Sequence, residues 1–185
     1  MSKPGNMLND SHWNHTRLLS YQKTVVIYDL TYHFCSRYID KRDRTFDQMV
    51  QAARSGKQNI VEGYADMMTS KEMGIKLFNV ARASLLELLE DYADYLRSRG
   101  FEQWDAQSEK VSFMRQLAAQ HDDSRYFLEL AESRSDEVVA NMAIVLIYQA
   151  EYLLSKFIDK EIEKFAAEGG FREQMTRVRL SVREK

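Results

Sequence analysis

Apolar side chains recur every three or four residues along most of this chain, which is the spacing of an α-helix with one buried face. The pattern predicts long helices over about 17–40, 45–68, 70–99 and 135–168. Residues 103–135 are ambiguous, because 104–120 and 125–132 can each form a shorter helix. We therefore expect an all-α fold, an antiparallel up-and-down four-helix bundle with an extra helical insertion before the last long helix.

The composition agrees with an all-helical chain. The single proline is Pro4, so no residue beyond it is prevented from being helical by a proline ring. Seven glycines in 185 residues are too few for an all-β protein with many tight turns. The expected organisation is a flexible N-terminal tail over 1–15, one bundle domain over 16–168 and a basic C-terminal tail over 169–185.

The second expected helix carries two stripes of different character. One is apolar, and the other consists of short or polar side chains at steps of three and four, namely Gln48, Ala52, Ser55, Asn59 and Glu62. An ordinary bundle helix has one apolar face and one charged face toward solvent. The second stripe therefore predicts close contact with a neighbouring helix or with a partner, and hydrogen bonds that satisfy its polar groups.

The same segment resembles a known family. Its motif stands at Gln48, Ala52, Ala53, Ser55, Asn59, Ile60, Glu62 and Gly63, and the next helix adds Arg82 and Ser84. This pattern resembles the bacterial four helix bundle protein family, also called the 23S rRNA intervening-sequence protein family. The resemblance covers about 47–96. It departs from the family at Gly56-Lys57, where Ile-Pro is usual, and at Val61, where alanine is typical.

The resemblance implies an assembly and a kind of partner. Members of this family tend to assemble as homo-oligomers, often as pentameric rings. A relative that accompanies the reverse transcriptase of diversity-generating retroelements is a basic pentamer that binds the enzyme and nucleic acid. Other members are encoded within ribosomal RNA intervening sequences. We therefore expect this chain to bind itself, with a pentamer as the reference case, and to contact RNA or a nucleic-acid enzyme.

The fourth expected helix is apolar on nearly every side. Between 138 and 158 it has little polar surface, and its centre from Met142 to Tyr148 is an unbroken apolar run. A helix that is apolar all round must be covered on more than one side. Either the bundle buries it centrally, or part of it packs against another subunit. Because each helix of a four-helix bundle normally keeps a solvent face, we place a subunit interface at Leu146 and Ile147.

Residue types that carry catalysis or bind metals are scattered. None of the four histidines has carboxylates at ligand spacing, and the single Cys35 excludes an intrachain disulfide. Glu62 and Arg82 lie on consecutive helices, where they can form an ion pair that fixes helix register, or a catalytic carboxylate with its partner. No second acid or histidine is placed for proton transfer. We expect no enzyme activity, no catalytic residue, no cofactor and no metal site.

Charge limits the nucleic-acid hypothesis to local patches. The chain has 26 basic and 28 acidic residues and a net charge of −2, whereas non-specific nucleic-acid binding depends on clustered lysine and arginine. The candidate contacts are Arg54 and Lys57 on the second helix and Arg177 and Arg179 in the tail. In a ring, even such a small patch is repeated in every subunit.

The sequence also predicts a location and a role. The longest apolar run is far short of the roughly 20 residues of a membrane span, and no secretory leader opens the chain, so we expect a cytoplasmic protein without a membrane partner. We expect a non-enzymatic, homo-oligomeric scaffold or adaptor that contacts protein or RNA through the surface around the second helix. The alternative is a nucleic-acid-binding accessory protein whose basic residues line a ring or groove.

Overall fold

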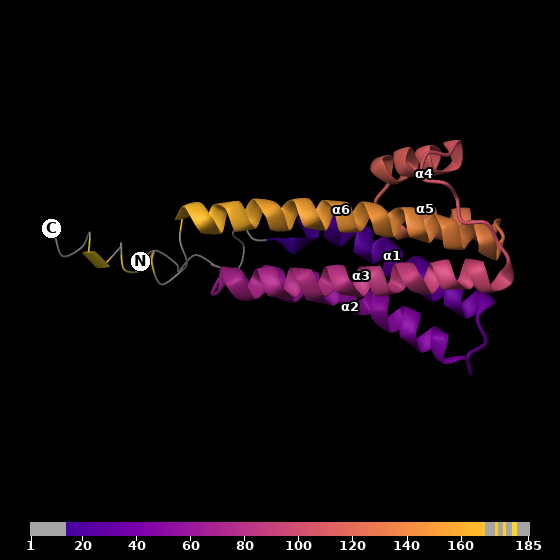
Figure 1. The fold of residues 1–185 in the computed structure, drawn as a ribbon, viewed down its shortest axis with the longest axis horizontal. Helices are drawn as coiled ribbons and strands as arrows, with labels where there is room; N and C mark the ends of the chain where they lie inside the picture. Colours follow the sequence, from indigo (N-terminus) through magenta and orange to yellow (C-terminus); the bar gives the residue numbers. More distant parts are fainter. Residues whose placement is uncertain (1–13, 169–172, 174–175, 177–178, 181–185) are drawn as a thin grey trace, which may run out of the picture.

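The computed structural model describes residues 14–168, together with residues 173, 176, 179 and 180. All regular structure in these residues is helical, as the sequence predicts. A short 3₁₀ helix, η2 (His15–Arg17), comes first (Figure 1). The α-helices are α1 (Leu19–Tyr38), α2 (Arg44–Asp66), α3 (Lys71–Arg99), α4 (Glu109–Gln120), α5 (Ser124–Glu132) and α6 (Asp136–Glu168).

Capping residues explain where the helices begin and end. Helices α2 to α5 each follow a residue whose side-chain oxygen accepts a backbone N–H of the first turn, namely Asp43, Ser70, Ser108 and Asp123. These contacts satisfy donors that have no partner inside the helix. Gly100 ends α3 with φ 68°, a left-handed conformation that glycine adopts without steric cost.

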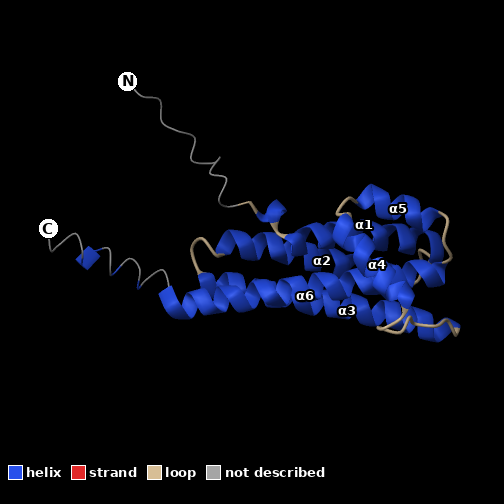
Figure 2. Ribbon diagram, turned by 90° about the horizontal axis from the view of Figure 1, so that it is seen from above, coloured by secondary structure: helices blue, strands red, loops and turns tan. Residues whose placement is uncertain are grey.

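The four long helices, α1, α2, α3 and α6, lie side by side around one core. Helix α1 packs against α2 and α6, and α3 packs against the same two helices (Figures 1 and 2). The largest fully buried side chains come from all four of them and include Phe34, Met49, Phe78, Tyr92 and Leu146. Each such side chain contributes roughly 1.5–3 kcal/mol through burial. The apolar stripes along the four helices therefore meet in one common core.

The segment between α3 and α6 covers two of the long helices. Helix α4 packs on α6, and α5 packs on α1 (Figure 2). The buried side of α4 consists of Val111, Met114 and Ala118. These residues recur every three to four positions, which is the spacing of an amphipathic helix with one apolar stripe.

A buried asparagine fastens the connection that leads into α4. Asn141 on α6 accepts a hydrogen bond from the backbone N–H of Trp104 (2.7 Å) and donates one to the carbonyl oxygen of Glu102 (2.9 Å). These bonds hold the backbone around Trp104 in a non-helical conformation. Helix α4 therefore begins at Glu109, whereas the sequence pattern predicts a start near 104.

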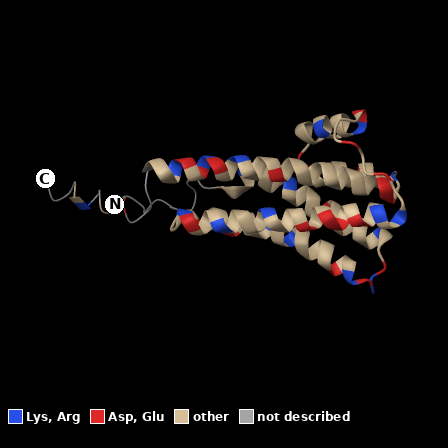
Figure 3. Cartoon of the chain, in the orientation of Figure 1, with Lys and Arg blue, Asp and Glu red and all other residues tan. Residues whose placement is uncertain are grey.

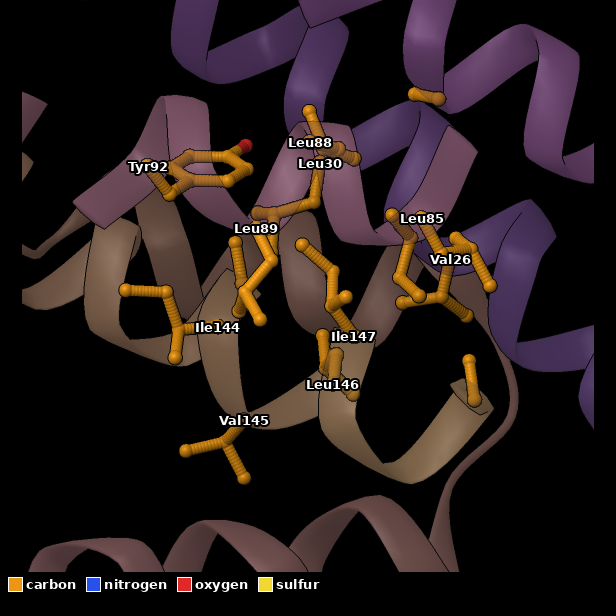
Figure 4. Packing of buried hydrophobic residues seen from close by; sticks show 14 of the residues in the cluster. Val26, Leu30, Leu85, Leu88, Leu89, Tyr92, Ile144, Val145, Leu146 and Ile147 are labelled. Atoms are coloured by element: carbon orange, nitrogen blue, oxygen red, sulfur yellow. The ribbon is translucent and has the colours of Figure 1, made fainter. Parts of the chain in front are cut away.

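The centre of α6 is buried within one chain, which corrects the predicted subunit interface. Leu146 and Ile147 are fully buried, and Figure 4 shows them among side chains of the neighbouring long helices. Val145 points to the opposite side of α6 in Figure 4, and it shares a hollow with residues of α4, as Ile144 does. The interface prediction was wrong because Leu146 and Ile147 face the core between the long helices, while α4 covers the side of α6 that carries Ile144 and Val145.

The other predicted boundaries agree closely with the structure. Each long helix begins and ends within two residues of its predicted range. Of the predicted N-terminal tail, residues 14 and 15 are described, and Asn14 caps η2 by accepting the backbone N–H of Thr16 (3.0 Å). Residues 1–13 and most of 169–185 lie outside the described residues, so the structure does not bear on the predicted tails.

By length and composition alone, α6 could cross a membrane. However, 61% of its most apolar window is buried inside the protein. The central helix of a water-soluble protein meets the same criterion, so this feature by itself assigns no location.

Candidate functional site

Part of the motif on α2 lies at the contact between α2 and α3. A Cβ atom at Gly63 would lie 3.0 Å from the carbonyl oxygen of Gly74, and a Cβ atom at Gly74 would lie 2.7 Å from the carbonyl oxygen of Gly63. The two backbones approach so closely that neither position has room for a side chain. The motif residues Ala52, Ala53 and Ile60 are buried as well. This part of the motif therefore serves helix packing.

Three polar residues of the motif, Ser55, Asn59 and Ser84, form hydrogen bonds within the chain. The hydroxyl oxygens of Ser55 and Ser84 share a hydrogen bond of 2.9 Å between α2 and α3. Asn59 Nδ2 donates to the carbonyl oxygen of Ser55 at 2.9 Å and to its hydroxyl oxygen at 3.1 Å. The sequence allowed either a helix or a partner as the neighbour of this stripe; Ser55 meets the helix α3, and Asn59 bonds to Ser55 within α2.

The expected ion pair between Glu62 and Arg82 is not formed. Glu62 is exposed on α2. Arg82 pairs instead with Glu151 of α6, with 2.6 Å between Arg82 Nε and Glu151 Oε1, and Ser155 Oγ donates to the same carboxylate oxygen at 2.9 Å. The prediction was wrong because Arg82 lies on the side of α3 that faces α6, not on the side that faces α2. The pair therefore links α3 to α6.

Gln48, the first motif residue, borders a polar hollow of about 630 Å³ between α2 and α3. Asp47, Glu87 and Asp91 make this hollow acidic. Burial raises the pKa of Asp91, and the carboxylates of Asp94 and Glu87 raise it further. Figure 3 shows acidic residues gathered on the same half of α3. Such a surface repels nucleic-acid phosphates.

Among the described residues, no group of histidine, cysteine or carboxylate side chains is placed to hold a metal ion.

The predicted nucleic-acid contacts differ in their surroundings. Arg54 is exposed on α2, but Lys57 Nζ lies 4.1 Å from the ring centroid of Tyr28, a cation–π contact that holds it against α1. Arg179 is exposed, whereas Arg177 lies outside the described residues. Figure 3 shows basic and acidic residues interspersed over the described helices. The described residues therefore give no continuous basic surface around Arg54.

A more apolar cavity of about 610 Å³ lies between α1, α4 and α6. Leu19, Ala118, Ala119 and Leu153 contribute apolar groups to its wall. Tyr148 and Tyr152 line it as well, and they remain 48% and 60% exposed. Pockets that bind small molecules have volumes of roughly 300–1,000 Å³ and mostly apolar walls with a few polar groups. Among the hollows in the described part of the chain, this one fits that description best.

Lys23 of α1 lines the cavity and is only 7% exposed. Its ammonium group donates hydrogen bonds to the carbonyl oxygens of Ala118 and His121, the latter at 2.7 Å. These carbonyls end α4, where the last backbone acceptors have no donor in the helix and where a positive charge is favourable. Burial lowers the pKa of Lys23, and the nearby carboxylate of Asp122 opposes this shift. Lys23 therefore caps the C-terminal end of α4 from a neighbouring helix.

Sequence reasoning assigned no role to Lys23, although a signal was present. Lys23, Ile27, Leu30 and Phe34 follow one another at steps of three and four, so they share the core-facing side of α1. A lysine in such a stripe needs hydrogen-bond acceptors inside the protein. Its acceptors lie 95 and 98 residues further along the chain, and no local pattern identifies them.

The comparisons with known proteins assign no function to this chain. No protein-family model matches the chain, and neither curated proteins nor solved structures give a match. The resemblance carried by the motif therefore stays a prediction. The described side chains provide close helix packing at the motif and an apolar cavity with a buried cation at its wall.

Proposed function

We propose that this protein is a non-catalytic helical scaffold or adaptor that self-associates and binds a protein or RNA partner. Its architecture is an antiparallel up-and-down four-helix bundle of α1, α2, α3 and α6, with α4 and α5 as the insertion. The pairwise packing of the long helices supports this architecture. So do the contacts between α3 and α6: Phe78 meets Phe157 and Arg82 meets Glu151, an order that antiparallel helices require.

The surface that carries the self-association proposal lies at the end of the molecule where α2 passes into α3. Met68, Met73 and Ile162 expose 56%, 46% and 47% of their surfaces there. Ile162 belongs to this end because Phe157 of α6 contacts Phe78 of α3, and the part of α6 beyond Phe157 runs toward the start of α3. Single exposed apolar residues are ordinary, but a group of them is typical of an interaction surface. This surface takes the place of the subunit interface predicted at Leu146 and Ile147.

The family resemblance supports the same kind of assembly. Several of its motif residues, such as Ser55, Gly63 and Ser84, lie at the contact between α2 and α3, and the family that they resemble tends to form rings, often of five subunits. The nucleic-acid-binding alternative has less support from the described residues, because Lys57 is held against Tyr28 and the neighbouring part of α3 is acidic. We therefore rank a protein partner above RNA.

Substitutions at the exposed end test the proposed surface. Met73→Asp and Ile162→Asp are expected to lower the mass measured by light scattering after size exclusion, without loss of helical circular dichroism. Phe113→Asp is the matched control, because Phe113 is an apolar residue of α4 that is 65% exposed. It should keep the wild-type mass. Unchanged masses for both test variants would reject this surface. A nucleic-acid absorbance spectrum in the purified protein would favour the alternative.

A further inference from the structure

Two residues that line the cavity between α1, α4 and α6 each have an unsatisfied hydrogen-bond acceptor. Gln22 of α1 and Gln149 of α6 both line it. The side-chain Oε1 atom of each is buried and has no hydrogen-bond partner in the described part of the chain. Buried polar atoms without a partner are uncommon, and each costs roughly 1–3 kcal/mol of stability.

Hydrogen bonds from the Nε2 atoms fix the orientation of both side-chain amides. Gln22 Nε2 donates to the carbonyl oxygen of Thr16 at 2.9 Å, and Gln149 Nε2 donates to the carbonyl oxygen of Arg115 at 3.1 Å. Turning either amide over would place two oxygen atoms against each other and remove these bonds. The two glutamines therefore present acceptors, and the group that satisfies them must be a donor.

The charges around the cavity select among donors. Lys23 and Arg115 both line it, so a cationic ligand would meet two positive charges. Asp122 is the acidic residue among those that line it, and its charge acts on Lys23. An anionic ligand would be attracted by Lys23 and Arg115, but it would be repelled by Asp122 and by the lone pairs of the two glutamine oxygens. A neutral hydroxyl or N–H group meets neither difficulty.

We propose that this cavity binds a neutral amphipathic small molecule, with its apolar body against Leu19, Leu153 and the tyrosine rings. Its hydroxyl or N–H group donates to Gln22 or Gln149. The site is separate from the exposed end that carries the self-association proposal, so that either proposal can fail without the other.

Three matched probes test this proposal on the full-length protein by isothermal titration calorimetry. 2-Naphthol has an apolar body and a hydroxyl donor, naphthalene has the body alone, and 2-naphthoate has an anionic head. 2-Naphthol is expected to bind roughly three- to tenfold more tightly than naphthalene, the effect of one net hydrogen bond. 2-Naphthoate is expected to bind more weakly than 2-naphthol. Equal affinity for 2-naphthol and naphthalene, strongest binding of 2-naphthoate, or no binding of any probe would overturn the proposal.

Variants locate the site. Ala119→Trp should abolish binding, because residue 119 lines the cavity and a large side chain there would take up its space. Ala83→Trp, at an exposed position of α3, should bind as the wild type does. The double substitution Gln22→Met and Gln149→Met should remove the preference for 2-naphthol over naphthalene. The same changes at the exposed Gln51 and Gln58 should keep it. Wild-type binding by the Ala119→Trp variant would place the ligand elsewhere and contradict the proposal.

Discussion

Lys23 on α1 donates a hydrogen bond to the carbonyl oxygen of His121, with 2.7 Å between Lys23 Nζ and that oxygen. The same ammonium group donates to the carbonyl oxygen of Ala118. Both acceptors belong to the last turn of α4 and the residue that ends it. The C-terminal end of α4 is thus bound to α1 by hydrogen bonds, in addition to the apolar contact of α4 with α6.

Replacing Lys23 by methionine should destabilise the protein by about 1–2 kcal/mol. Methionine keeps an apolar stem but leaves two carbonyl oxygens of α4 without donors, and part of that loss is offset because no charge is buried. Urea unfolding followed by circular dichroism measures the change. Hydrogen exchange should show faster exchange in α4 than in α3. Unchanged exchange in α4 would mean that the lysine does not hold this helix.

The contribution of Lys23 to stability should rise with pH in the alkaline range. Folding lowers its pKa below the ordinary value of 10.5, so between the lowered value and 10.5 the unfolded chain binds more protons than the folded one. Below this window both states carry the charge, and the burial cost is constant. The stability difference between wild type and Lys23→Met should therefore shift in favour of the wild type as pH rises through the window. A shift toward the variant would contradict a lowered pKa.

Leu146 should behave as a core residue. Its side chain is fully buried, so Leu146→Ala should lower the free energy of unfolding by about 2–5 kcal/mol, and Leu146→Asp should lose helical circular dichroism. Tyr152→Ala, at a position of the same helix that is 60% exposed, serves as the comparison and should cost much less. A Leu146→Asp variant that stays helical and only becomes smaller would restore the subunit interface that burial rejects.

Gly74 should tolerate alanine less well than Gly56 does. A Cβ atom at Gly74 would lie 2.7 Å from the carbonyl oxygen of Gly63 and would also collide with Met67, so the backbones of α2 and α3 must separate. We expect a loss of about 1–3 kcal/mol. At Gly56 the nearest atoms belong to the flexible side chain of Leu85, at 3.1 Å, and the gain in helix propensity keeps the change within about 1 kcal/mol. Equal losses in urea unfolding would argue against the close contact.

Cys35 should be unreactive in the folded protein. It is fully buried, and burial, helped by the carboxylate of Asp91, raises the pKa of its thiol to about 12. The thiolate is the reactive form, so an aromatic disulfide reagent at mildly alkaline pH should label the chain only after urea is added. Since this is the single cysteine, the signal has one source. Labelling at the rate of the unfolded chain, without urea, would show that α1 opens readily.

The helices were predictable because their signals are local. Ser70 caps α3 and Gly100 ends it, and both features depend on residues within a few positions of each other. The buried faces follow from the spacing of apolar residues in the same way. Which short helix covers which long one is a matter of tertiary contact. The pattern of Val111 and Met114 predicts a buried side for α4, but not that α6 lies beneath it.

The same distinction between local patterns and tertiary contacts separates the predicted from the unpredicted parts of the candidate site. The small and polar stripe around Ser55 indicated a close helix contact, and α3 supplies it through Ser84. Arg82 was given the wrong partner, because the sequence does not say which of two neighbouring helices a residue of α3 faces. The cavity beside Lys23 was not predicted at all. It is assembled from α1, α4 and α6, and it exists only when all three are packed.

The mass of the 185-residue chain in solution is the most direct test of self-association. Sedimentation equilibrium over a range of concentrations should give a multiple of 21.7 kDa, with about five times that mass as the value expected from the resemblance. Such a result supports a self-associating scaffold and leaves Met73 and Ile162 as the surface to map. A mass of 21.7 kDa at every concentration would contradict self-association.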